Sequence, residues 1–188
     1  KYIALGTSPD NTNFNEDQKA KMAAFGETFP ARVHDMTGIA TDKIAAYTPL
    51  SAPASADGTV DRILIFRMMH NLMRWGIAGS EVDAMAKLLK PGGMIGIVQH
   101  RAKADAPADY VDGSKGYLKQ ADLIKFMDDH GFELVGESEI NANPNDTADY
   151  PNGVWTLPPT FALKDTDKEK YEAIGESDRM TLLFKKKA

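Results

Sequence analysis

Two segments decide the fold of this chain, residues 60–66 (VDRILIF) and residues 88–101 (LLKPGGMIGIVQHR). Each contains a continuous apolar run, at residues 63–66 and 94–98. Unbroken runs of this length are typical of strands that are covered on both faces, as in parallel sheets. The Pro-Gly-Gly at residues 91–93 is a helix stop followed by a turn. We therefore expect two buried strands with a helix between them.

The alternation of strands and helices continues in both directions from these segments. Further strands are predicted at residues 2–5, 31–36, 132–140 and 180–184, helices at 15–29, 80–89 and 118–130, helical turns at 42–47 and a loop at 48–59. This order predicts a doubly wound α/β fold with a mainly parallel sheet covered by helices on both sides. The last strand lacks a comparable preceding helix, so we expect it to enter antiparallel. We expect one domain over residues 1–188, with a long insert at residues 141–177 between the last two strands.

Composition excludes several classes of function. The 188 residues are 43% hydrophobic, enough for a sizeable core. The chain has no Cys, which excludes disulfides, thiolate zinc sites and a Cys nucleophile. It has 22 basic and 27 acidic residues and a net charge of −5, which argues against nucleic-acid binding. No apolar run approaches the roughly 20 residues of a membrane span, so we expect no membrane partner. Cytoplasmic, periplasmic and secreted locations all remain open.

From residue 60 onward the sequence resembles the class I S-adenosylmethionine-dependent methyltransferases. The resemblance rests on five segments in this order: VDRILIF with RMMHNL (60–72), LLKPGGMIGIVQHR (88–101), LKQADLIKFMDDHGF (118–132), ELVGESEI (133–140) and TLLFKKK (181–187). It implies a Rossmann-like fold, S-adenosylmethionine as cofactor and methyl transfer to a small-molecule acceptor. One alternative is a non-catalytic methyltransferase-like domain with a binding or structural role. Another alternative is a different doubly wound enzyme, such as a reductase. The sequence lacks a dinucleotide-binding fingerprint, which counts against a reductase.

The N-terminal third matches the family more loosely. On this alignment residues 2–6 (YIALG) correspond to the family's second strand and residues 31–36 (ARVHDM) to its third. The family's first strand, with its glycine-rich cofactor loop, would then lie before Lys1. Because that strand is central in the family's sheet, its absence would expose two strand edges. We therefore expect an upstream segment, or a partner chain, to supply a central strand.

The candidate cofactor residues follow the predicted strands, because ligands of open parallel sheets bind beyond the carboxyl ends of the strands. They are Gly6, Thr7, Asp35, Met36, Arg67 and Met68. The resemblance implies that Asp35 accepts a hydrogen bond from the adenine amino group and that Met36 packs on the ring; the alternative for Asp35 is a helix cap or turn. The family's ribose-binding acid is missing after the first predicted strand, where Asp10 is the nearest substitute.

The candidate catalytic residues are His70 and His100, which follow the two strands that decide the fold. An imidazole in this position would remove a proton from a hydroxyl or amine acceptor. The alternative for His70 is a residue at a helix start that bonds to the backbone. Together with Asp35 the two histidines lack the spacing of a local metal-binding motif, and we expect no metal.

Four further residues are candidates for substrate binding: Asn71, Trp75, Arg101 and Trp155. Arg101 would clamp an anionic acceptor through its bidentate fork, and its alternative is a surface ion pair. Trp155 lies in the aromatic and proline-rich insert, where it is predicted to line an acceptor pocket. The other aromatic residues of the insert are expected to pin it onto the sheet.

Overall fold

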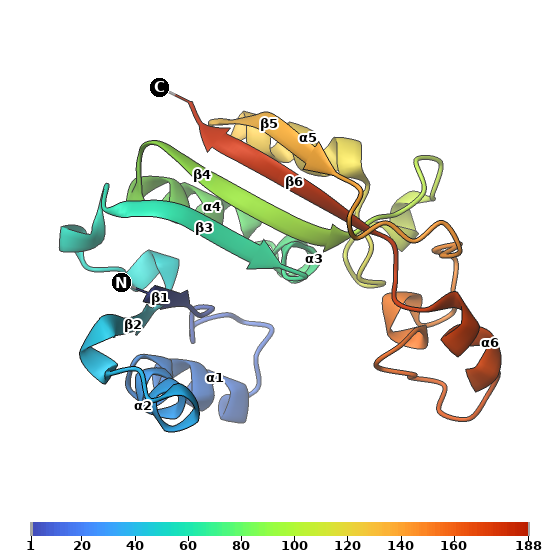
Figure 1. Cartoon of the computed structure of the whole chain (residues 1–188), viewed down its shortest axis with the longest axis horizontal. Helices are drawn as coiled ribbons and strands as arrows, with labels where there is room; N and C mark the ends of the chain where they lie inside the picture. Colours follow the sequence, from blue (N-terminus) through green and yellow to red (C-terminus); the bar gives the residue numbers. More distant parts are fainter. Residues whose placement is uncertain (1, 188) are drawn as a thin grey trace. The chain divides into compact units, whose positions relative to one another are not determined.

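A computed structural model of the protein describes residues 2–187. It divides the chain into two compact units, one ending at Thr59 and the other beginning at Val60 (Figure 1). Each unit has its own sheet.

The first unit pairs a short parallel sheet with two helices. Strand β1 (Tyr2–Leu5) lies parallel to β2 (Ile44–Tyr47), and α1 (Glu16–Ala23) and α2 (Phe25–Thr37) connect them. The N-terminus of α1 is a capping box, as the sequence predicts. The Asn15 side chain accepts from the backbone N–H of Gln18 at 2.9 Å, and the Gln18 side chain accepts from the backbone N–H of Asn15 at 3.0 Å. The unit also contains short 3₁₀ turns at Thr41–Lys43, Pro49–Ser51 and Ala54–Ala56.

The strand predicted at residues 31–36 is wrong. Helix α2 continues through Pro30 to Thr37 and ends at Gly38, whose φ is 72° and whose N–H donates to the carbonyl of His34 at 2.8 Å. Most of this stretch is exposed, which suits an outer helix face and not a buried strand. The second strand of the unit is β2, within residues 42–47, where the sequence predicts helical turns.

The second unit is a four-stranded sheet in the order β3-β4-β6-β5. Its elements are β3 (Val60–Phe66), α3 (Met69–Arg74), α4 (Ala78–Leu88), β4 (Leu89–His100), α5 (Gln120–Asp129), β5 (Phe132–Ser138), α6 (Lys168–Ile174) and β6 (Arg179–Lys186), with 3₁₀ turns at Ala108–Tyr110 and Gly153–Thr156. Strand β3 is parallel to β4, whereas β6 runs antiparallel between β4 and β5. The predicted α/β fold with an antiparallel last strand is confirmed.

One face of this sheet carries the core of the unit. Paired side chains of β3, β4 and β6 are buried on it together with residues of α4 and α5, which Figure 1 shows behind the sheet: Ile63, Ile65, Ile95, Ile97, Leu182, Phe184, Val82, Leu88, Leu123 and Met127. The opposite face is open at β3, where Leu64 and Phe66 are 64% and 61% exposed. The expected helical cover is therefore present on one face of this unit.

The connection between β5 and β6 is anchored by buried polar contacts. The carboxylate of Asp146 accepts from the Tyr117 hydroxyl at 3.0 and 3.1 Å, from the N–H of Ala148 at 2.8 Å and from the N–H of Asp178 at 2.7 Å. A small apolar cluster of Tyr150, Leu157 and Tyr171 packs within the connection itself. These contacts give the insert a fixed structure beside the sheet.

Candidate functional site

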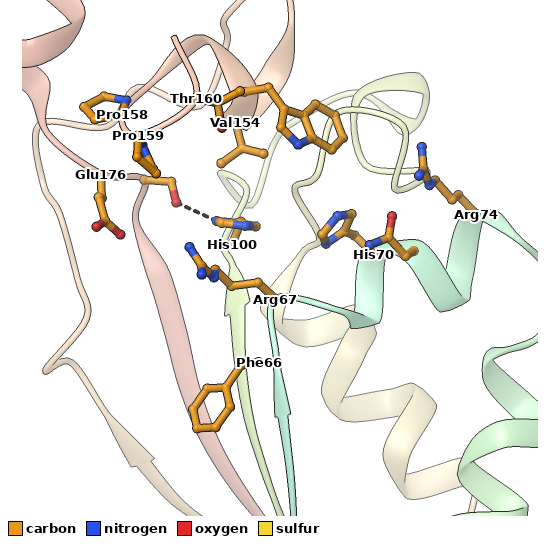
Figure 2. A pocket seen from close by; sticks show the side chains of 13 residues that line it. Phe66, Arg67, His70, Arg74, His100, Val154, Pro158, Pro159, Thr160 and Glu176 are labelled. Carbon is orange, nitrogen blue, oxygen red and sulfur yellow. Dashed lines mark hydrogen bonds between the residues drawn. The ribbon is translucent and has the colours of Figure 1, made fainter. Parts of the chain in front are cut away.

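A cavity of about 590 Å³ lies at the carboxyl ends of β3 and β4 (Figure 2). Strand ends, the start of α3 and the insert all contribute to its wall: Phe66, Arg67, His70, Asn71, Arg74, His100, Val154, Trp155, Pro158, Pro159, Thr160, Glu176 and Ser177. This is the edge of a parallel strand pair at which ligands of α/β proteins bind.

The chain turns sharply from β3 into the cavity wall at Arg67. The Arg67 N–H still pairs with β4, donating to the carbonyl of Val98 at 2.7 Å, while its φ of 51° lies in the left-handed region. That region is unfavourable for a residue with a side chain, and such residues concentrate at functional sites. The turn allows α3 to start at Met69, which places His70 in the first turn of the helix beside the end of β4.

The side chain of Gln99 determines which nitrogen of His70 carries the proton. Gln99 is fully buried, and its Nε2 donates to the carbonyl of Gly116 at 2.7 Å, so its Oε1 is the acceptor that faces His70. Oε1 lies 3.3 Å from both the backbone N and the Nδ1 of His70. The Nδ1 of His70 must therefore carry hydrogen, which leaves an unprotonated Nε2.

Both histidines of the cavity are held in the neutral form. Burial lowers the pKa of His70, the hydrogen bond with Gln99 opposes this shift in part, and the charge of Arg74 adds to it. Burial also lowers the pKa of His100, to about 3, with further contributions from His70, Arg179 and Arg67. The two rings lie 5.7 Å apart. His70 is the better proton acceptor of the two, because a base with a pKa near 3 binds protons weakly at neutral pH.

A hydroxyl from the insert holds the ring of His100. Ser177 Oγ lies 2.5 Å from His100 Nδ1, and the Tyr117 ring meets the imidazole edge-on with centroids 6.2 Å apart. Residues 77 positions apart are thus brought together, which ties the insert to the end of β4. Figure 2 shows this hydrogen bond at the centre of the cavity.

The apolar wall of the cavity comes from the turn Gly153–Thr156. Trp155 meets the His70 ring edge-on at a centroid distance of 5.9 Å. The turn lies very close to the backbone of the connection between β4 and α5: a Cβ on Gly153 would stand 2.1 Å from the Lys115 carbonyl oxygen, and the φ of Gly153 is 58°. Glycine is therefore required at this position for Trp155 to sit beside His70.

The structure brings five predicted site residues together at the cavity: His70, His100, Arg67, Asn71 and Trp155. Trp75 and Met68 lie outside its wall, next to residues that line it. Trp75 supports the guanidinium of Arg74, which lies 5.4 Å from its ring centroid, and the Met68 sulfur accepts from Asn71 Nδ2 at 3.4 Å. His70 does lie at a helix start, but its backbone N–H and its ring both bond to the side chain of Gln99 and not to the backbone.

Arg101 was predicted either to bind an anionic acceptor or to form an ion pair, and in the structure it forms an ion pair. Its guanidinium binds Asp178 at 2.9 and 3.0 Å and Glu139 at 2.6 and 2.9 Å, and it is not part of the cavity wall. Hydrogen bonds to Glu139 and then to Asp178 raise its pKa. Arg101 therefore fastens together the two ends of the insert.

The positional argument for Asp35 and Met36 does not hold in the structure. Both lie on α2 instead of after a strand, and Met36 is 77% exposed. No hydrogen bond of the Asp35 side chain is found among the described residues. The misassigned strand at residues 31–36 is the cause of both assignments.

The other predicted cofactor residues, Gly6 and Thr7, follow β1 in the first unit. A Cβ on Gly6 would lie 2.8 Å from the Phe25 ring, so glycine allows this ring to pack on the backbone. The buried Asn11 lies a few residues further on, and its Oδ1 accepts from Asn13 at 2.9 and 3.0 Å. Within residues 2–187 its Nδ2 has no hydrogen-bond partner.

Sequence reasoning missed Arg74, Glu176 and Ser177, and it assigned no role to Gln99. Arg74 and Glu176 carry no local motif, and Ser177 lies 77 residues from its partner. The alternation in β4 does contain a signal for Gln99: it occupies the same face as the buried Ile95 and Ile97, where a polar side chain requires a partner.

No protein-family model matches this sequence, and no curated protein matches it significantly. Solved structures match its fold. The [4+2]-cyclase SpnF aligns with all of this chain and 74% of its own at 14% identity, with a TM-score of 0.57. A geranyl diphosphate methyltransferase in complex with SAM aligns with 98% of this chain and 77% of its own at 12% identity and a TM-score of 0.56. The enzyme from Streptomyces coelicolor A3(2), geranyl diphosphate C-methyltransferase, aligns at 11% identity, 98% and 72% coverage and a TM-score of 0.56.

The chain has the class I S-adenosylmethionine-dependent methyltransferase fold. This methyltransferase fold also occurs in a protein named as a cyclase, so the reaction has to be argued from the site. Over residues 2–187, none of the helices combines the length and apolar character that crossing a membrane requires. In the same part of the chain no three His, Cys, Asp or Glu side chains are arranged to hold a metal ion.

Proposed function

We propose that this protein transfers the methyl group of S-adenosylmethionine to a hydroxyl or amine of a small molecule bound in the cavity, with His70 as the general base. The observation that carries the proposal is the Gly116–Gln99–His70 chain, which leaves His70 Nε2 unprotonated in a cavity at the carboxyl ends of β3 and β4. The methyltransferase fold supports the choice of reaction.

Taken by itself, the first unit carries groups suited to binding a nucleoside. Asn11 provides a buried Nδ2 without a partner among the described residues, and a nucleoside hydroxyl or ring nitrogen would satisfy it. We assign the same role to the backbone at Gly6 and Thr7, which follow β1. When bound, S-adenosylmethionine would supply a methyl group on a positively charged sulfur. The acceptor would take the methyl group, and the neutral thioether S-adenosylhomocysteine would leave.

His70 would act on the acceptor and not on the cofactor. His70 Nε2 would accept the O–H or N–H proton of the acceptor as the acceptor takes up the methyl group that the bound cofactor would supply. The Nδ1–H of His70 remains bonded to Gln99 Oε1 throughout, which fixes the ring and supports the imidazolium. Trp155 and Val154 line the same cavity and would exclude water from the reacting atoms.

The proposal is tested by following transfer of isotopically labelled methyl from S-adenosylmethionine to a panel of phenols, amines and hydroxy acids. We expect His70→Asn to lower the rate at least about 100-fold, the usual contribution of a general base. His130→Asn is the matched control, because His130 lies on α5's C-terminal side in an ion pair with Asp83 and is not part of the cavity wall. Unchanged turnover in His70→Asn would remove the proposed base.

Cofactor binding is measured separately by calorimetric titration with S-adenosylhomocysteine. Asn11→Ala is expected to weaken binding about tenfold, whereas Asn145→Ala, an exposed asparagine in the second unit, leaves it unchanged. A folded chain that binds no S-adenosylhomocysteine at millimolar concentration would contradict the cofactor assignment. A chain that binds it and transfers no methyl group to any acceptor would instead be a non-catalytic binding domain.

A further inference from the structure

We infer that the acceptor carries an oxyanion, a carboxylate or a phosphate, that binds Arg67, and an apolar body that packs against Trp155. The inference rests on the proposed function, since it takes the cavity as the acceptor site. It adds the chemical class of the acceptor, which the fold leaves open.

The cavity wall has an excess of positive charge. Arg67 and Arg74 line it, and Glu176 is its single carboxylate. Glu176 is already paired with Arg179, which lies beside His100 across the β4–β6 ladder. Within residues 2–187, neither Arg67 nor Arg74 has a carboxylate within 4.0 Å. This local excess stands out in a chain with 27 acidic and 22 basic residues.

Arg67 is the better placed of the two arginines. It holds the turn that closes β3, and its guanidinium points toward His100 in Figure 2. Its charge acts on His100, which places it close to the buried part of the wall. Arg74 instead lies over the Trp75 ring at 5.4 Å and contributes to the field near His70. A guanidinium fork binds a carboxylate or phosphate with two parallel hydrogen bonds.

The remaining wall selects the body of the ligand. Trp155, Val154 and Pro159 offer apolar surface on the insert side, whereas His70 Nε2 is the proton acceptor within the same cavity. A hydroxy acid with an aromatic or aliphatic body fits this wall. Its oxyanion would bind Arg67, its apolar part would pack on Trp155, and its hydroxyl would donate to His70 Nε2.

A bound oxyanion would also change the protonation of the histidines. Arg74 lowers the pKa of His70, while Arg67, Arg179 and His70 lower that of His100; Glu176, Ser177, Gln99 and Tyr117 are the other polar groups around them. An anion at Arg67 offsets part of this positive field and raises the proton affinity of His70. Anion binding should therefore be accompanied by proton uptake as the pH falls below about 6.5, the ordinary histidine pKa.

The test uses three phenols of similar shape: 4-hydroxybenzoate, 4-hydroxyphenyl phosphate and the neutral 4-hydroxybenzamide. The chain has two tryptophans, so Trp75→Phe leaves Trp155 as the single fluorescent indole in the cavity. Titrations in chloride-free buffer should show binding of one or both anions at least tenfold tighter than binding of the amide. The tighter of the two anions identifies carboxylate or phosphate.

In the Trp75→Phe background, Arg67→Gln should weaken anion binding at least tenfold and leave amide binding unchanged. Arg67→Lys keeps the charge without the fork and should give an intermediate loss. Arg62→Gln is the matched control, because Arg62 lies on β3, the strand that Arg67 follows, is exposed and is not part of the cavity wall. Equal binding of anion and amide, or unchanged anion binding in Arg67→Gln, would overturn the inference.

Titration of the same samples with S-adenosylhomocysteine separates this inference from the proposed function. Anion binding that requires Arg67 supports the oxyanion site whether or not the cofactor binds. Cofactor binding with no preference for the anions would retain the proposed function and reject the oxyanion site. Failure of cofactor binding alone counts against the proposed function only.

Discussion

The tautomer of His70 is set by Gln99, a residue that is not part of the cavity wall. Gln99 is a positioning residue: its amide orientation follows from Gly116, and the tautomer of His70 follows from Gln99. A merely structural role would not affect which ring nitrogen carries hydrogen. The tautomer is therefore the property that tests this arrangement.

We predict that Gln99→Met retains the fold and loses the fixed tautomer of His70. Nitrogen NMR of labelled histidine should show a single form of His70, protonated at Nδ1, in the wild type and a mixture in the variant. His34, in the first unit, is the internal reference and should not change. A single Nδ1-protonated form in both proteins would contradict the role of Gln99.

The buried His100 predicts how stability depends on pH. Its pKa is about 3 in the folded protein and about 6.5 when unfolded. Between these values the unfolded chain binds a proton that the folded chain does not, so stability falls as the pH is lowered from 6.5 toward 3. The slope is up to about 1.4 kcal/mol per pH unit for this group. Above pH 6.5 the contribution of His100 is fully present.

Urea unfolding should therefore show that the free energy of unfolding falls less between pH 7 and pH 5.5 in His100→Gln than in the wild type. The window stays above the usual carboxylate range, so histidines dominate the change. An identical pH dependence of the two proteins would show that His100 is not buried in the neutral form.

At the residue scale, the sequence identified those site residues that lie at the end of a strand or within a few residues after it. His70, His100 and Arg67 could be predicted because the carboxyl ends of parallel strands converge. Arg101 also follows a strand, but it is not part of the cavity wall. It pairs instead with Glu139 and Asp178, which lie 38 and 77 residues away. Contacts at such separations depend on how the insert folds back, and no local pattern contains that information.

At the scale of elements, hydrophobic patterning succeeded for the long buried strands and failed for the exposed part of α2 and for short elements. Strands β3 and β6 match their predicted core segments closely. The single helix predicted at residues 15–29 is two helices, α1 and α2, and α2 continues through Pro30 because one missing backbone donor did not end it. Helix α3 was not predicted at all, because its six residues are too few to show a helical period.

Substitutions on the two faces of β3 are expected to change the free energy of unfolding by different amounts. Leu64 is 64% exposed and Ile65 is 5% exposed. We expect Ile65→Thr to lower the free energy of unfolding by about 2–4 kcal/mol, because it puts a hydroxyl into the core. Leu64→Thr should cost less than about 1 kcal/mol. Equal losses in denaturant unfolding would show that the outer face of β3 is also covered in solution.

The turn that carries Trp155 depends on Gly153. A Cβ there would meet the Lys115 carbonyl, so Gly153→Ala should displace the turn and change the fluorescence of Trp155 in the Trp75→Phe background. Gly58→Ala is the matched control: its φ of 63° is similar, but no atom lies within 4 Å of the added Cβ. Gly58→Ala should show only the backbone strain, about 1 kcal/mol or somewhat more, with unchanged fluorescence. Equal effects of both substitutions would contradict the close approach.

At the scale of the whole molecule, the fold could be predicted and the reaction could not. The order of strands and helices led to the methyltransferase fold, which solved structures share at TM-scores up to 0.57 among those described here. The chemistry depends instead on a few side chains that the insert, α3 and the strand ends bring to one cavity. Their combination of a neutral imidazole, two arginines and an indole is the basis on which we propose a hydroxy acid as the acceptor.

The central claim is that this cavity holds the acceptor with its hydroxyl at His70. The most direct measurement is a crystal structure of the protein with S-adenosylhomocysteine and 4-hydroxybenzoate or 4-hydroxyphenyl phosphate. The account predicts the phenol oxygen within hydrogen-bond distance of His70 Nε2 and the oxyanion on the guanidinium of Arg67. A ligand bound outside the cavity, or bound in it with the hydroxyl turned away from His70, would contradict the account.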